Sequence, residues 1–532
     1  MNMNIIFFIV LIIQINYIIC QEYESKIEKT SKINGVYRID SKNNDFHLIY
    51  ERNEVKFSKA KPKIKEYFRI IPTENNLYFI EFKALNKNLG VDKNGTIKLF
   101  EKKTYWNITQ LNNSKYIIQN NYTKNFLEIK DEYPVCLNKL ENITNDKISD
   151  NFIFTFFKIF EEVLIKPEHI KLIEDEPVDV LIKYIDLSDN TLSRANIKQV
   201  KKDEDNEELK YCVRSILENI PWIRKIFILM PNDKVKYFKP IEEIKEKIVY
   251  VKDKDFLGFD SSNSNTFQYN LYNMEKFGIS DNFILMDDDY FIGKPINKTK
   301  FFYYDEKQKK VLPSIVSDDL SELNKEDTIS KLNKINRKRN INLHSFYGWK
   351  LAQLNAFLFL LEQFGSPLIN AGFTHNAIPI NINDMKELFD LMKNNYTDAN
   401  EILYAKERTI HDLQFQSLYM TYSLNVKKRK VNSIPWIYID LGEANLKSLN
   451  IELFVINTSG DRIYKKEEYQ TAKDILEIKF NKPTKYEIVL FDKTENISHN
   501  TNKSIDNNQS KNIEIQKQIN DSSQILNKYQ KN

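Results

Sequence analysis

The sequence predicts a multidomain protein in which an all-β N-terminal part precedes an α/β part with a mainly parallel sheet. Its 532 residues are more than one domain of roughly 150 residues would need. Residues 30–162 are rich in short alternating strands separated by Asn, Gly and Lys turns, which is typical of an all-β unit. From about residue 170, short apolar strands alternate with helical spacing, as in α/β domains.

Residues 30–162 also carry a faint internal repeat with a period of about 40 residues. Each copy has an apolar stretch, a polar turn and two alternating apolar positions. The copies are "FHLIYERNEVKFS" (46–58), "NLGVDKNGTIKLF" (88–100) and "NFLEIKDEYPVCLN" (125–138). Three such units resemble a β-trefoil of the ricin-type or fascin-like kind. That resemblance implies a module that binds a carbohydrate or a protein, and a spacer that binds nothing is the alternative.

The second part is predicted to span residues 170–490. Its apolar strands are 178–186, 223–230, 246–253 and 281–289. Helical spacing is found in 206–220, 351–365 and 408–424, and 303–345 forms a charged insertion that we expect to be mobile.

Two terminal segments are predicted to lie outside these domains. Residues 1–20 are shorter than the roughly 20 apolar residues of a membrane span and fit a cleaved secretory signal peptide. No Lys or Arg precedes the apolar run, so an uncleaved membrane anchor is the alternative. We expect contact with a membrane only if the segment is such an anchor. Residues 492–532 are rich in Asn, Ser, Lys and Gln and are predicted to be disordered.

Composition narrows the compartment and the partners. Twelve N-x-[ST] sequons agree with a glycoprotein of the secretory pathway, either in the ER/Golgi lumen or secreted. A net charge of +4, from 78 basic and 74 acidic residues, does not indicate a surface that binds nucleic acid. If Cys20 is removed, Cys136 and Cys212 remain in different predicted domains, so we expect no disulfide framework and no cysteine metal site.

Three consecutive acids interrupt an otherwise apolar stretch, "FILMDDDYFIGKP" (283–295). Unpaired buried carboxylates cost several kcal/mol each. Either the strand ends at Met286 and the acids lie in a solvated turn, or Asp287, Asp288 and Asp289 mark the rim of a site that holds a divalent cation. Acids at the carboxyl end of a strand are where open α/β sheets bind ligands.

Four stretches between about 175 and 490 resemble, in order, the conserved regions of the Stealth proteins. These are hexose-1-phosphoryl transferases of microbial capsule synthesis, related to the catalytic subunit of N-acetylglucosamine-1-phosphotransferase. The second stretch, "DNEELKYCVRSILENIPWIRKIFIL" (205–229), carries most of the resemblance. The others are "VDVLIKYIDLSD" (178–189), "NAGFTHNAIPI" (370–380) with "KERTIHDLQF" (406–415), and "KFNKPTKYEI" (479–488).

The resemblance implies roles for individual residues. It implies an Mg²⁺ or Mn²⁺ ion on Asp288 and Asp289, and catalytic roles for His375, Asp289, Arg408 and Asp186, with His375 as the acid/base. The positions implied to bind substrate are Asp179, Ser188, Asp189, Asn206, Glu208, Arg214, Asn265, Thr266 and Lys406. For Arg214, a salt bridge to Glu207 or Glu218 is the alternative to phosphate binding.

The chain departs from the family pattern at two places. Asn270 stands where the family usually has Glu, and Leu187 stands where it usually has Gly. If the Glu is catalytic in relatives, the activity of this chain is altered.

The implied reaction transfers a sugar-1-phosphate, such as N-acetylhexosamine-1-phosphate from UDP-GlcNAc, to a hydroxyl of a glycan or glycoprotein, with release of a nucleoside monophosphate. One alternative is a secreted glycan-binding protein with an inactive transferase domain. Another is an ordinary metal-dependent glycosyltransferase, although such an enzyme does not predict the block at 205–229.

Overall fold

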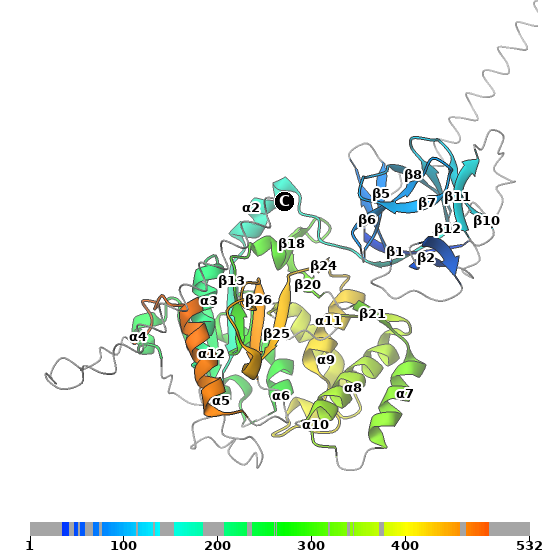
Figure 1. The fold of residues 1–532 in the computed structure, drawn as a ribbon. Coiled ribbons are helices and arrows are strands. Elements are labelled where there is room, and N and C mark those ends of the chain that lie inside the picture. The colour runs from blue at the N-terminus through cyan, green and yellow to red at the C-terminus, as the bar shows by residue number, and fades with distance from the viewer. Residues whose placement is uncertain are drawn as a thin grey trace, which may run out of the picture. The chain divides into compact units, whose positions relative to one another are not determined.

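A computed structural model describes residues 35–488, apart from 42–46, 52–53, 59–66, 74–76, 84, 113–114, 131–132, 139–153, 185–206, 231–236, 260, 262, 318–319, 338–340, 344, 372–376 and 458–463 (Figure 1). The predicted signal peptide and the predicted disordered tail therefore lie outside the described residues. None of the helices in the described part of the chain is long and apolar enough to cross a lipid bilayer.

The N-terminal part is all-β, as predicted, and its strands form one antiparallel sheet. The strands are β1 (Gly35–Ser41), β2 (His47–Glu51), β3 (Glu54–Ser58), β4 (Phe68–Pro72), β5 (Tyr78–Phe82), β6 (Lys87–Val91), β7 (Ile97–Phe100), β8 (Trp106–Asn112), β9 (Lys115–Asn120), β10 (Phe126–Lys130), β11 (Tyr133–Asn138) and β12 (Phe154–Phe160). Trp106 and Leu89 are buried in its core, and the indole Nε1 of Trp106 donates to the carbonyl of Leu89 at 2.9 Å.

Six of these strands close into a ring, in which β1, β4, β5, β8, β9 and β12 each pair with the next and β12 pairs back with β1. The remaining strands form the hairpins β2–β3, β6–β7 and β10–β11. Each hairpin falls within one copy of the repeat read from the sequence. The two strands on either side of each polar turn therefore pair as a hairpin.

The second part is built on a five-stranded sheet in the order β15–β14–β13–β16–β23. Its strands are β13 (Val178–Lys183), β14 (Ile226–Met230), β15 (Ile248–Lys252), β16 (Asn282–Asp287) and β23 (Ile378–Asn381). The first four in the sheet are mutually parallel, and β23 runs antiparallel to β16. The four apolar runs predicted as strands thus pair as a parallel sheet.

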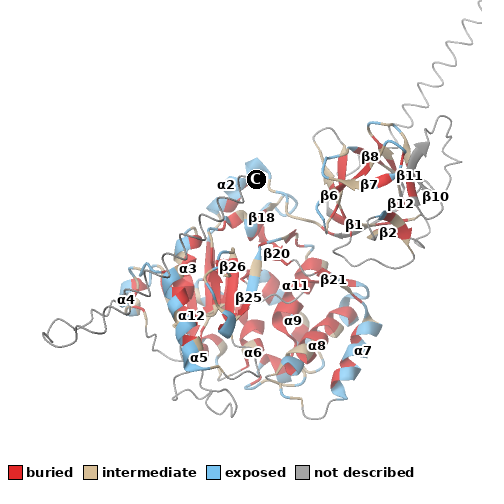
Figure 2. Ribbon diagram, viewed as in Figure 1, coloured by how far each residue is buried: buried red, intermediate tan, exposed pale blue. Residues whose placement is uncertain are grey.

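Alternate residues of each strand point to opposite faces, and each face has its own apolar core. Val180 and Ile182 belong to the core shared with α3 (Glu208–Asn219) and α12 (Lys466–Lys479). Leu181 belongs to the core shared with α8 (Phe346–Phe364), α9 (Ile382–Asn395) and α11 (Phe415–Asn425). The strands are buried on both sides, which explains their nearly continuous apolar sequence (Figure 2).

Other elements surround this sheet. The helices are α2 (Pro167–Asp175), α4 (Ile241–Ile244), α5 (Asp253–Leu257), α6 (Ser264–Tyr269), η4 (Leu271–Phe277), η5 (Lys298–Lys300), α7 (Lys325–Asn336), α10 (Ala399–Leu403) and η6 (Leu441–Glu443). The strands are β17 (Tyr290–Ile292), β18 (Phe302–Asp305), β19 (Lys310–Pro313), β20 (Ile315–Val316), β21 (Leu320–Leu323), β22 (Leu368–Ala371), β24 (Val431–Asn432), β25 (Trp436–Asp440) and β26 (Leu453–Asn457). Strands β17, β26 and β25 form a separate three-stranded sheet.

Two expectations about this part need correction. The stretch 303–345, expected to be mobile, contains β19 to β21 and α7, because Thr328, Leu332 and Ile335 are spaced to bury one face of α7 while its charges cover the other. Helix α11 begins only at Phe415, where the side chain of Gln414 caps it by accepting from the amide of Ser417 at 2.7 Å. Residues 408–414, predicted to be helical, form a loop.

Candidate active site

A polar pocket lies at the carboxyl ends of β13 and β16. The parallel strands lie in the order β15, β14, β13, β16. From β13 the chain adds β14 and β15 on one side and then β16 on the other, so the direction in which strands are added changes between β13 and β16. In doubly wound sheets this reversal opens a crevice where ligands bind. The pocket is lined by Lys183, Ser264, Asn265, Gln268, Asp287, Tyr290, Leu343, Gly348, Trp349, Ala352, Arg408, Thr409, Asp412, Gln414, Gln416 and Asn457.

The three acids form the turn by which the chain leaves the central sheet. Strand β16 ends at Asp287, and β17 begins at Tyr290 in the other sheet. The ammonium of Lys183 lies 2.9 Å from a carboxylate oxygen of Asp287, and the amide of Asn457 donates to the carboxylate of Asp289. The strand therefore ends in a turn, and Asp287 of that turn lines the pocket, whereas the bound cation stays a prediction.

Helix α3 and the residues after it fix the segment that follows the acids. The hydroxyl of Ser215 accepts from the amide of Ile292 at 3.1 Å, and the amide side chain of Asn219 donates to the carbonyl of Ile292 at 2.7 Å. The indole of Trp222 donates to the carbonyl of Ile296 at 2.8 Å. These residues belong to the block at 205–229, so part of that block serves to hold the acid turn in place.

Negative charge accumulates at this turn. Burial raises the pKa of Asp288 well above its usual range, and the carboxylates of Asp289, Glu208 and Asp287 raise it further. Burial also raises the pKa of Asp289, with Asp287 and Glu208 as the next causes. Glu208 begins α3, so the structure brings this predicted residue to the acids. When burial and mutual repulsion raise the pKa values of neighbouring carboxyl groups, a nearby cation stabilises their charged forms.

The donor set fits a hard divalent cation. It consists of the carboxylate oxygens of Asp288 and Asp289, and Mg²⁺ and Mn²⁺ prefer oxygen ligands. Mg²⁺ is commonly bound by one or two carboxylates together with substrate phosphates. Asp288 and Asp289 fit this mode, because they directly follow Asp287, which lines the pocket.

The loop 408–414 brings a positively charged side chain, Arg408, to the wall of the pocket. The guanidinium of Arg408 donates to the carbonyl of Leu343 and to the hydroxyl of Ser264, both at 3.3 Å. Burial lowers the pKa of Arg408, although an arginine stays charged at any physiological pH. Arg408 therefore presents a fixed guanidinium to the pocket, and this geometry suits a phosphate.

Asp412 anchors the same loop. Its carboxylate accepts from the side-chain amides of Asn263, at 3.0 and 3.1 Å, and Asn265, at 3.3 Å. Thr409 adds a hydroxyl at 3.2 Å. Burial raises the pKa of Asp412 in spite of these donors. Asn265, predicted to bind substrate, thus lies in the pocket wall and also holds the loop that carries Arg408.

Asp179 lies far from this chemistry, at the amino end of β13. One carboxylate oxygen accepts from Arg224 Nε and from the amide of Lys225, both at 2.9 Å. The other accepts from Arg224 Nη2 at 2.5 Å and from the amide of Ser280 at 2.7 Å. These bonds saturate a buried carboxylate, so the geometry gives Asp179 a structural role, and among the described residues it does not line the pocket.

Arg214 is buried between α3 and α12. Its guanidinium donates to the carbonyl of Phe480 at 2.7 Å and to the carboxylate of Glu477 at 3.2 Å. The expected salt bridge was therefore the better of the two interpretations, although its partner is Glu477 rather than Glu207 or Glu218. Phosphate binding by Arg214 is not favoured by this position.

Thr266 and Asn270 connect α6 to α10. The hydroxyl of Thr266 donates to the carbonyl of Ile402 at 3.0 Å. The amide of Asn270 donates to the carbonyls of Thr266, at 2.8 Å, and Leu403, at 3.0 Å. Both side chains are buried outside the described pocket lining. The departure at Asn270 therefore concerns packing at the end of a helix and not a group that faces the pocket.

Other predicted residues cannot be placed against the pocket. Lys406 is exposed between α10 and the loop 408–414, and it is not among the described lining residues. Those outside the described residues are Asp186, Ser188, Asp189, Asn206, His375 and Leu187. Their roles remain predictions.

The sequence interpretation missed several pocket residues. Lys183 ends an apolar strand, as Asp287 does, and this shared position at a strand end was the available signal. Gln268 lies one helical turn after Ser264 on α6. Trp349 and Gln416 come from α8 and the start of α11, and only the tertiary fold brings them to the pocket.

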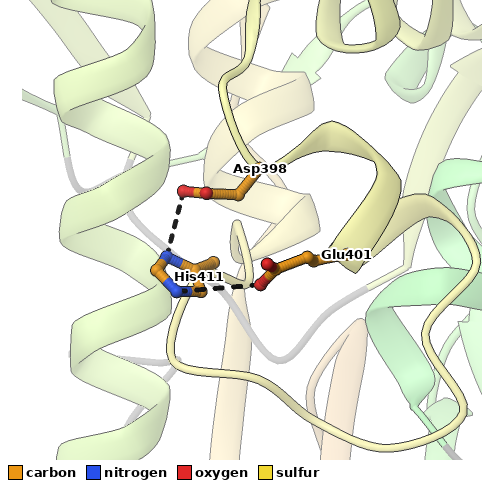
Figure 3. A group of neighbouring side chains, drawn as sticks. All are labelled: Asp398, Glu401 and His411. Atoms are coloured by element: carbon orange, nitrogen blue, oxygen red, sulfur yellow. Dashed lines mark ion pairs between the residues drawn. The ribbon is translucent and has the colours of Figure 1, made fainter.

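A second group of titratable side chains is formed by His411 of the loop 408–414 with Asp398 and Glu401 (Figure 3). His411 Nδ1 is 3.0 Å from Asp398, and His411 Nε2 is 3.8 Å from Glu401. One ligand atom from each lies within 4.8 Å of the others. Because the carboxylates face opposite ring nitrogens, ion pairing accounts for this arrangement, and it ties the loop to the start of α10.

The fold and the site define an α/β protein with acids and a guanidinium at the carboxyl ends of its parallel strands. Residues 202–310 match the family model "Stealth protein CR2, conserved region 2". A capsular polysaccharide phosphotransferase of Haemophilus influenzae is 26% identical over 265 residues, covering 49% of this chain and 65% of that protein. An exopolysaccharide phosphotransferase of Nocardia farcinica is 34% identical over 110 residues, covering 20% of each chain. The chain is thus similar to the Stealth proteins, as its motifs predict, and residues 202–310 carry the match to their conserved region 2.

These alignments cover only part of this chain and only part of each relative. The chain spans less than two thirds of the Haemophilus protein, and 58% of a capsular polysaccharide phosphotransferase of Actinobacillus suis that is 24% identical over 245 residues. Among solved structures, SeviL bound to asialo-GM1 saccharide is similar at 15% identity and a TM-score of 0.20, over 24% of this chain and 100% of that one.

Proposed function

We propose that the protein transfers a sugar-1-phosphate from a nucleotide-diphosphate sugar to a glycan hydroxyl and releases a nucleoside monophosphate. The observation that carries the proposal is that Asp287, the first of the three acids, and Arg408 line one pocket. This pocket lies at the carboxyl ends of β13 and β16, and β16 falls within the match to Stealth conserved region 2. The names of the relatives, which are capsular and exopolysaccharide phosphotransferases, support the reaction class.

The chemistry is one displacement at phosphorus. The acceptor hydroxyl oxygen bonds to the sugar-proximal phosphorus, the bond from that phosphorus to the bridging oxygen breaks, and the bridging oxygen leaves with the nucleoside monophosphate. Such reactions depend mainly on positioning and on neutralising charge. An Mg²⁺ or Mn²⁺ ion on Asp288 and Asp289 would neutralise diphosphate charge when bound.

The chain's own residues do the rest in this proposal. Arg408 holds phosphate oxygens, because its guanidinium is fixed by Leu343 and Ser264 at the pocket wall. Lys183 keeps Asp287 paired, so that the other two acids are available to the ion. His375 is the proposed base that takes the hydroxyl proton.

The test is to identify the nucleotide product. The purified full chain is incubated with UDP-GlcNAc and other nucleotide sugars, with Mg²⁺ or Mn²⁺ and a panel of oligosaccharide acceptors. We expect UMP, and we expect Arg408→Ala to slow its release by about 10²- to 10³-fold. Ile410→Ala is the matched control, because Ile410 is exposed on the same loop and is not among the described pocket-lining residues.

Each other product contradicts the proposal. UDP as the product would indicate ordinary glycosyl transfer. If no nucleotide is released from any donor with any acceptor while the chain binds glycans, the protein is a glycan-binding protein with an inactive transferase domain.

For the N-terminal part we propose a β-trefoil that binds carbohydrate. The ring of six strands with three hairpins, repeated at the spacing seen in the sequence, supports this fold. We also propose that the protein acts in the ER/Golgi lumen or outside the cell, where glycan acceptors are found. Loss of glycan-array binding on deletion of residues 30–162 would support the first proposal, and unchanged binding would contradict it.

A further inference from the structure

A cluster of aromatic side chains lies where the pocket meets solvent. Phe346, Tyr347 and Trp349 occupy the first turn of α8, and we call them the aromatic rim. Trp349 lines the pocket, whereas Phe346 is 68% exposed and Tyr347 is 44% exposed. Large aromatic side chains that stay exposed beside a polar pocket are typical of binding sites.

The rings of the rim contact one another. The ring centroids of Phe346 and Trp349 are 6.1 Å apart with an interplanar angle of 30°. Phe346 and Tyr347 meet edge to face, with centroids 5.8 Å apart. The ring that lines the pocket is therefore continuous with rings that face solvent, and the rim forms a path from the outside into the site.

The backbone beneath the rim is tightly packed and leads directly to Arg408. A Cβ at Gly348 would lie 2.4 Å from the Cα of Leu343, so only glycine allows this turn to approach that segment. The carbonyl of Leu343 in turn accepts from Arg408 at 3.3 Å. The rim and the guanidinium that faces the pocket are thus held by the same short segment.

We propose that the aromatic rim is a subsite for sugar residues of the acceptor glycan, which stack their C–H faces on the rings. The negative face of an aromatic ring attracts the weakly positive hydrogens on one face of a pyranose. This inference rests on the proposed function, because it names the substrate that enters from this side.

The geometry favours an acceptor over the base of the donor. Donor phosphates belong between Arg408 and the acids, inside the pocket, whereas the acceptor has to enter from solvent. A single planar base uses the face of one ring. The rim instead offers connected rings at different tilts, which suits the successive rings of an oligosaccharide.

The experiment compares the double variant Phe346→Ala/Tyr347→Ala with wild type in the full chain. Phe364→Ala is the matched control, because Phe364 is 40% exposed at the other end of α8. We expect the double variant to raise the acceptor KM by about tenfold, and to leave the donor KM and the acceptor-free release of UMP within about twofold. Phe346→Trp keeps a stacking ring and should restore the acceptor KM.

Two kinetic results would overturn the inference. An unchanged acceptor KM in the double variant removes the subsite. A raised donor KM with an unchanged acceptor KM assigns the rim to the nucleotide base instead.

Binding without donor separates this inference from the proposed function. If wild type releases no nucleotide, the proposed function fails, and an array of oligosaccharides probed with both proteins then tests the rim alone. Glycans bound by wild type and by Phe364→Ala but lost in the double variant support a sugar-binding rim. Identical arrays for all three proteins, including arrays with no bound glycan, contradict it.

Discussion

Asp179 lies at the amino end of β13, and Asp287 to Asp289 lie at the carboxyl end of β16, the strand hydrogen-bonded beside it. At the first position four hydrogen bonds, two of them from Arg224, saturate a single carboxylate. At the second, three acids in sequence share a turn with Glu208, and burial and mutual repulsion raise the pKa of Asp288 and of Asp289. A carboxylate that the protein itself saturates supports the fold, whereas carboxylates left crowded at a pocket are available to a ligand.

The largest effect is expected from a substitution at the carboxyl end of β16. Asp289→Asn should lower the rate of UMP release by about 10³-fold, because the proposed reaction uses this carboxylate to hold the cation that neutralises the diphosphate. The same change should leave the unfolding temperature unchanged or raised when no metal is added, since it removes a repelled buried charge. Thermal unfolding with and without Mn²⁺, beside the kinetic assay, checks both parts. A variant that loses stability and activity together would show that Asp289 is structural.

The amino end should respond in the opposite way. Asp179→Asn should destabilise the α/β part by about 2–3 kcal/mol, because Arg224 loses its charged partner and a buried acceptor is lost. Arg224 is partly exposed, so we expect a smaller loss of stability than when both partners of an ion pair are buried. Folded protein should keep its turnover per molecule. Unfolding monitored beside active-site titration measures both, and a folded but inactive variant would contradict the structural role.

The sequence predicted the central sheet well and the roles of its polar residues less well. Strands such as 178–186 and 281–289 stand out because burial on both faces requires continuous apolar residues. The hydrogen bonds from Arg224 to Asp179 and from Asn457 to Asp289 could not be predicted from the residues around each aspartate. Their partners are distant in the sequence and come together only in the fold. Helical spacing likewise gave no sign that 408–414 leaves the helix to line the pocket.

A smaller effect is expected where the chain departs from the family pattern. Asn270→Glu should destabilise the protein by about 2 kcal/mol, because it buries a carboxylate and removes both donors that reach Thr266 and Leu403. It should not raise turnover, since Asn270 lies outside the described pocket lining. Asn273→Glu on η4 serves as a control at a partly exposed position of the same segment. A faster enzyme with Asn270→Glu would show that the position acts in catalysis after all.

The smallest effect concerns the ion pairs between α3 and α12. Burial alone would raise the pKa of Glu477, but the hydroxyl of Tyr211 and the charges of Arg214 and Lys210 lower it overall. A carboxyl whose pKa is lowered by folding stabilises the protein above its unfolded pKa of about 4.3, and that stability is lost as the pH falls through the folded pKa.

Glu477→Gln should therefore lower the unfolding temperature at pH 7, and the difference from wild type should shrink below a pH of about 4. The expected cost is below about 1 kcal/mol, because Glu477 is partly exposed and solvent screens its charge. Glu467→Gln, at an exposed position of α12, is the control and should show a smaller difference at both pH values. A difference that grows as the pH falls would contradict the assignment, because it would mean that Glu477 is stabilising in its protonated form and that Arg214 is held by the carbonyl of Phe480 alone.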